Sequence, residues 1–120
     1  MPMEDAPILV LCDDAETANA LVTRIAHMHA DVVYAPNKLT ALLRISQFQF
    51  AAAVLVRQAD TDDVAATLRA KGVPFCILDT ASSKPVAVES GQVVVCDMDL
   101  VVPTVRALVT REGGEIPSPG

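Results

Sequence analysis

The chain has 120 residues, of which 52% are hydrophobic and 3% aromatic, and its formal net charge is −6. This length suits one domain of ordinary size, and the acidic balance argues against binding to nucleic acid or an anionic membrane surface. No apolar run approaches the about 20 residues that span a bilayer, and the acidic start of the chain lacks the basic region of a signal peptide. The sequence therefore predicts a cytoplasmic protein.

Apolar runs and amphipathic stretches alternate along the first half of the chain. The predicted strands cover residues 8–12, 31–35 and 50–56, and the predicted helices cover residues 15–30 and 38–47. The strands are short apolar runs bounded by polar or turn-forming residues, whereas apolar residues recur every three or four positions in the helices. Asp14 and Asn37 directly precede the helices, where their side chains can accept hydrogen bonds from free backbone N–H groups.

The alternation continues in the second half with one interruption. The sequence predicts a helix over 64–71, strands over 73–78 and 93–96, and a final helix capped by Asp99 and ending near residue 111. Gly72 follows the first of these helices at the position where glycine is favoured. Residues 79–92 are expected to be loop-like, so that the fourth helix is short or absent. The domain then covers residues 7–112, and residues 1–6 and 113–120 are expected to be disordered.

Alternating strands and helices predict a parallel sheet with right-handed crossovers. The expected fold is α/β and flavodoxin-like, a doubly wound sheet of five parallel strands in the order 2-1-3-4-5. Valine-rich runs suit such a sheet, because helices cover both of its faces. The three cysteines, Cys12, Cys76 and Cys96, lack the spacing of a zinc site. They are therefore expected to be buried free thiols.

Functional sites in open α/β sheets lie beyond the carboxyl ends of the strands. The residues predicted at that edge are Cys12, Asp13, Asp14, Val56, Arg57, Asp79 and Asp97. Among the acids, Asp13 and Asp14 are candidate ligands for Mg²⁺, which binds one or two carboxylates plus waters. The alternative is that Asp14 caps a helix and that Arg57 pairs with Asp13, as a permanent substitute for a metal or a lysine. No other cofactor is expected.

The run Ile8-Leu9-Val10-Leu11-Cys12-Asp13-Asp14 resembles the first-strand motif of response-regulator receiver domains, the CheY-like superfamily. Residues 50–55 and 72–75 resemble the third and fourth strands of that family, and the resemblance covers about residues 7–111. In receivers, acids after the first strand hold Mg²⁺, and an Asp at the end of the third strand accepts a phosphoryl group from a histidine kinase. A Thr or Ser and a Lys then contact the phosphate.

Most of that phosphorylation chemistry has no counterpart in this sequence. Asp13 matches the principal acid, but Cys12 stands where the other acid often is. Val56 stands in place of the acceptor Asp and has no nucleophilic oxygen. Asp79 stands at the Thr or Ser position, where a carboxylate would repel phosphate, and Asp97 falls near the Lys position. The resemblance therefore implies a degenerate receiver, or pseudo-receiver.

The sequence favours a stand-alone receiver-like module that is not an enzyme and that acts by protein–protein contact without aspartate phosphorylation. One alternative is a phosphorelay receiver with an atypical acceptor, for which Asp60, Asp62 and Asp63 are the nearest carboxylates after Val56. Another is a divalent-cation-dependent small-molecule binder at the acidic strand edge.

The final helix is apolar on most of its circumference, which is typical of a helix buried on more than one side. The last helix of receivers also helps to form their dimer face. A homodimer or a bound protein partner is therefore predicted there, through Leu100, Val101, Val105, Leu108 and Val109. The alternative is that this helix covers core left open by a shortened fourth helix.

Overall fold

A computed structural model describes residues 6–27, 31–57, 61–79, 86–89 and 92–113 of the chain. Its strands are β1 (Ile8–Leu11), β2 (Val32–Ala35), β3 (Ala52–Val56), β4 (Phe75–Leu78), β5 (Val86–Glu89) and β6 (Gln92–Val95). Its helices are α1 (Ala15–Ala26), α2 (Lys38–Gln47), α3 (Thr61–Ala70) and α4 (Val101–Gly113), the last preceded by the short 3₁₀ turn Met98–Leu100. The termini predicted to be disordered lie outside the described residues, apart from Ala6 and Gly113.

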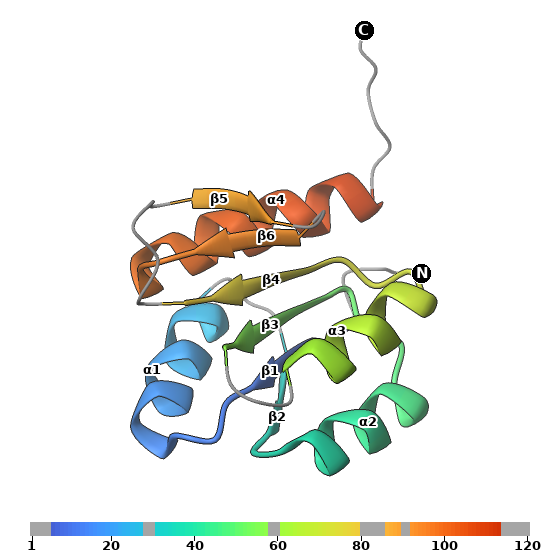
Figure 1. Cartoon of the computed structure of the whole chain (residues 1–120). Helices are drawn as coiled ribbons and strands as arrows, with labels where there is room; N and C mark the ends of the chain where they lie inside the picture. Colours follow the sequence, from blue (N-terminus) through green and yellow to red (C-terminus); the bar gives the residue numbers. More distant parts are fainter. Residues whose placement is uncertain (1–5, 28–30, 58–60, 80–85, 90–91, 114–120) are drawn as a thin grey trace, which may run out of the picture.

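The described strands form one sheet in the order β2-β1-β3-β4-β6-β5 (Figure 1). Within the first five strands of this order, from β2 to β6, neighbouring strands pair in parallel. In chain order they give the predicted arrangement 2-1-3-4-5, so the flavodoxin-like fold is confirmed. Such a sheet collects the carboxyl ends of its parallel strands at one edge.

The strand β5 is a departure from the prediction, which had loop throughout residues 79–92. It pairs antiparallel with β6 at the edge of the sheet. Two residues separate Glu89 from its partner Gln92, the length of the commonest hairpin connection. The β-branched residues Val86 and Val88 favour an extended strand. The strands β5 and β6 therefore form a hairpin, in the part of the chain where the sequence predicts a loop before the last parallel strand.

The core consists of two apolar layers, one on each face of the sheet. Successive residues of β1 point to opposite faces, so Ile8 and Val10 pack with α1 and α4 while Leu9 and Leu11 pack with α2 and α3. Figure 1 shows α2 and α3 side by side on one face. All four residues of β1 are at most 1% exposed, which explains their uninterrupted apolar run.

The residues that the sequence predicts as an interface on α4 pack inside the domain. Val101 and Val105 are fully buried and Leu108 is 8% exposed, all within the core layer shared with α1. Leu100 and Val109 are partly buried against the same layer. The exposed side of α4 carries Pro103, Arg106 and Ala107 instead. The helix is thus one-sided, and its apolar residues cover the sheet.

The start of α3 differs from the sequence-based prediction. The helix α3 begins at Thr61 rather than Val64, and the Thr61 hydroxyl donates to the Val56 carbonyl (3.1 Å). Asp62 and Asp63 therefore lie in its first turn, where acids interact favourably with the helix dipole. The predicted end at Gly72 is confirmed by its left-handed φ of 74°. No helix among the described residues is long and apolar enough to cross a bilayer.

Candidate functional site

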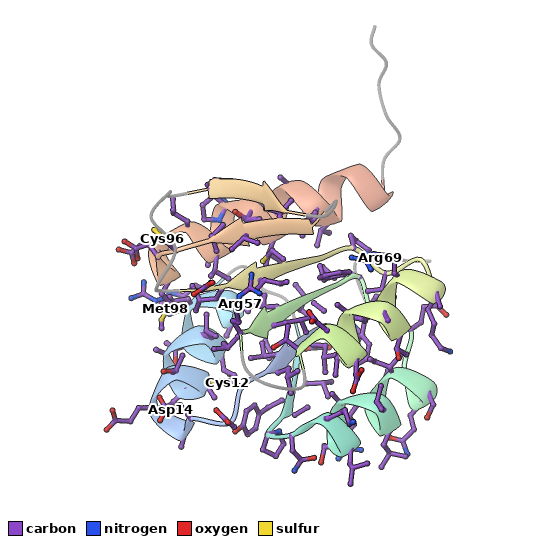
Figure 2. The ribbon with its side chains drawn as sticks, in the orientation of Figure 1. Cys12, Asp14, Arg57, Arg69, Cys96 and Met98 are labelled. Atoms are coloured by element: carbon purple, nitrogen blue, oxygen red, sulfur yellow. The ribbon has the colours of Figure 1, made fainter. Side chains whose placement is uncertain are left out.

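The predicted site residues gather at the carboxyl edge of the sheet, where Figure 2 labels Cys12, Arg57 and Cys96. Cys12 follows β1, Arg57 follows β3 and Asp79 follows β4. The strands β3 and β4 are in register up to their last residues, Val56 and Leu78. The residues that follow, Arg57 and Asp79, therefore emerge side by side.

Arg57 and Asp79 form a salt bridge across the ends of β3 and β4. The distance from Arg57 Nε to Asp79 Oδ2 is 2.8 Å, and the two side chains are 38% and 22% exposed. The predicted pairing of Arg57 with Asp13 is therefore wrong. Asp13 lies in the bend between β1 and α1 and is exposed, whereas the register of β3 and β4 brings Asp79 next to Arg57. The Arg57 guanidinium is therefore engaged by the residue that follows β4.

The turn from β1 into α1 is organised by Asp14, as predicted for a helix cap. Its carboxylate accepts hydrogen bonds from the backbone N–H of Thr17 (3.1 Å) and from the Thr17 hydroxyl. The Thr17 donors, the hydroxyl first, hold the pKa of Asp14 below its usual value. The Cys12 thiol donates to the Asp14 carbonyl at 3.3 Å, and burial raises the pKa of that thiol. Cys12 is thus a buried free thiol here, as expected.

The acids after β6 serve local structure. Asp97 Oδ1 accepts from the backbone N–H of Asp99 (2.9 Å) and caps the 3₁₀ turn. The Asp99 carboxylate lies 2.7 Å from Arg24 Nη1 on α1. The predicted capping role of Asp99 is therefore wrong, because the turn that precedes α4 moves the cap to Asp97.

The candidate metal ligands Asp13 and Asp14 are consecutive residues between β1 and α1. Within the part of the chain that the structure describes, no group of three or more His, Cys, Asp or Glu side chains could hold a metal ion. Asp60 lies outside the described residues. Asp62 and Asp63 lie on the first turn of α3, and Asp63 Oδ2 is 3.0 Å from Lys38 Nζ.

Tyr34, for which the sequence predicts no role, also belongs to this edge. Its hydroxyl donates to the Cys12 carbonyl at 2.9 Å and so ties the end of β2 to the end of β1. Its ring, 39% exposed, lines an open groove of about 570 Å³ along α1, together with Ala15, Glu16, Ala18, Asn19 and Val22. In the β1–β2 register Tyr34 pairs with Val10, and this pairing places the Tyr34 ring beside α1. That register could have been anticipated from the predicted strands.

Solved structures share this fold. The receiver domain of the Francisella response regulator 1452 superposes with a TM-score of 0.70 at 19% identity, covering 88% of this chain and 98% of that one. A sensor protein from Polaromonas sp. JS666 superposes with a TM-score of 0.67 at 13% identity, covering 89% and 98%. No protein-family model matches the sequence, and neither does any curated protein. The likeness shows that the fold is that of receiver domains.

The Arg57–Asp79 salt bridge is expected to show a measurable coupling energy. In a double-mutant cycle of Arg57→Ala and Asp79→Ala, urea unfolding should give about 0.5–1 kcal/mol, because the pair is only partly shielded from solvent. The matched control is the Arg24–Asp99 pair, whose side chains are 44% and 70% exposed and which should give a smaller value. Additive effects of the two alanine substitutions would contradict the coupling.

Proposed function

We propose that this chain is a receiver-like signalling module whose output is protein–protein contact and which does not use aspartate phosphorylation. The receiver-type fold supports a signalling role, and one observation carries the rest of the proposal. At the carboxyl ends of β3 and β4, Val56 ends β3 without a carboxylate, and the residues that follow the two strands, Arg57 and Asp79, form a salt bridge.

Phosphoryl transfer needs a nucleophile in line with the phosphorus and positive charge around the oxygens. Val56 ends β3 with a partly buried hydrocarbon side chain and can provide no nucleophile. The Asp79 carboxylate would repel an incoming phosphate, and it already engages the Arg57 guanidinium. The Arg57–Asp79 pair is therefore balanced in charge by itself, which favours one constant conformation over a phosphate-driven switch.

Acetyl phosphate with Mg²⁺ is expected to leave the intact mass of the protein unchanged. The same reaction with a receiver domain that has an acceptor aspartate is the positive control. A mass gain of one phosphoryl group that hydroxylamine removes would identify an acyl phosphate and overturn the proposal. The substitutions Asp13→Asn, Asp62→Asn and Asp63→Asn would then locate the acceptor.

A backbone-amide NMR titration with Mg²⁺ alone separates the proposal from a cation-dependent binder. The amide signals of Asp13, Val56 and Asp79 are expected to stay in place at millimolar Mg²⁺, since Asp14 is engaged in capping α1. Saturable movement of these signals would instead favour the cation-dependent alternative.

A further inference from the structure

Figure 1 shows α2 and α3 next to each other on one face of the sheet. Their outer sides carry exposed apolar side chains and are called here the α2–α3 face. Leu39 is 76% and Leu43 52% exposed. They lie one turn apart on the side of α2 that points away from its buried residues. On α3, the exposed residues Ala66 and Ala70 are likewise one turn apart. An exposed leucine pair beside small residues is a surface that another helix can cover.

The charges on this face have opposite signs at its two ends. Asp62 lies in the first turn of α3, and Lys71 directly follows its last turn. The rise of a helix places these two residues about 13 Å apart along the axis. Asp63 is engaged by Lys38, but among the described residues neither Asp62 nor Lys71 has an ion-pair partner. One end of the face therefore offers a carboxylate and the other an ammonium group.

An open pocket of about 260 Å³ lies at the Lys71 end of the face. It is lined by Ile45, Phe48, Gln49, Lys71 and Val73, and Phe48 is 44% exposed. Along the chain, Leu43 stands four residues after Leu39 and five before Phe48. Leu43 is thus close to the midpoint between a projecting leucine and a pocket of suitable size for a leucine side chain.

We propose that the α2–α3 face binds a second copy of this chain around a two-fold axis near Leu43. With the helices of the two copies antiparallel, Leu43 packs on the partner's Leu43 and Leu39 enters the partner's pocket beside Phe48. Asp62 then faces the partner's Lys71. A two-fold interface requires such self-complementarity, which a surface for an unrelated protein does not need. The inference rests on the proposed function only in taking protein contact as the output.

The face is about 15 Å long and two helices wide, which is small for a permanent dimer interface. We therefore expect a reversible dimer with a dissociation constant in the micromolar range. Sedimentation velocity from low micromolar to near-millimolar protein should show the monomer converting to dimer. A chain that stays monomeric over this range would overturn the proposal and leave the face to a different protein.

Leu43→Glu is expected to weaken the dimer at least tenfold, because it places two like charges at the axis. Leu43 is half exposed, so the variant should keep the circular dichroism spectrum of the wild type. The matched control is Val86→Glu, at a residue 51% exposed on β5, which should dimerise like the wild type. A dimer unaffected by Leu43→Glu would overturn the proposal.

Charge reversal tests the predicted orientation. Asp62→Lys and Lys71→Glu should each weaken the dimer, since each creates two contacts between like charges, and the double variant should restore it. Failure of the double variant to recover would overturn the antiparallel arrangement. The dimer and the proposed function can be contradicted separately. A dimeric protein that takes up phosphate from acetyl phosphate would overturn the proposed function alone. A monomeric protein that takes up no phosphate would overturn the dimer alone.

Discussion

Val105→Asp is expected to leave the chain without a stable fold. Val105 is fully buried on α4 and packs with Val101 and Leu108 against the sheet. An unpaired carboxylate at such a position costs several kcal/mol, and protonating it still leaves a polar group without partners. Because the whole free energy of unfolding of a domain is about 5–15 kcal/mol, this single substitution is comparable to the total.

Far-UV circular dichroism and urea unfolding provide the measurement. The wild type should unfold cooperatively, whereas Val105→Asp should show a weak or absent transition. Ala107→Asp is the matched control, because Ala107 lies two residues away on the exposed side of α4 and should tolerate the charge. A well-folded Val105→Asp variant that differed only in oligomeric state would restore α4 as an interface.

The five parallel strands could be predicted because buried strands are short runs of apolar residues, which are visible in the sequence. A strand covered on both faces excludes polar side chains, as Ile8–Leu11 illustrates. The sequence pattern of the edge strand β5 is weaker, since Val86 is 51% exposed and only four residues pair with β6. The apolar pattern of α4 was ambiguous for a different reason: Val101, Val105 and Leu108 would look the same whether a sheet or a second protein covered them.

The position of the candidate site could be predicted more reliably than its contacts. The topology alone placed Arg57 and Asp79 at the carboxyl edge, but two acids, Asp13 and Asp79, could have reached Arg57. The bend after β1 and the register of β3 with β4 decided between them. Such choices depend on distances of a few ångströms in loops, which residue patterns do not encode.

Alkaline solution is expected to destabilise the fold strongly through Cys76. This residue lies on β4 and is fully buried, and burial raises the pKa of its thiol from 9.0 to about 12. The unfolded chain therefore releases this proton near pH 9, while the folded protein retains it up to about pH 12. Stability from this group is complete below pH 9 and is lost as pH rises through that interval.

The size of the effect follows from the same pKa values. Each pH unit in the interval removes about 1.4 kcal/mol, so the whole interval corresponds to roughly 4 kcal/mol. Cys12 adds to the loss in the same direction, because burial also raises the pKa of its thiol. Urea unfolding at neutral pH and at several pH values above 9 should therefore show a steep fall in the free energy of unfolding.

Comparison of variants isolates the contribution of Cys76 from that of other groups that titrate in base. Cys76→Ala lowers stability at neutral pH by creating a small cavity, but its free energy of unfolding should then fall less steeply with pH than that of the wild type. Equal slopes in the wild type and Cys76→Ala would mean that the Cys76 thiol ionises equally well in the folded and unfolded states. That result would contradict its burial in the core.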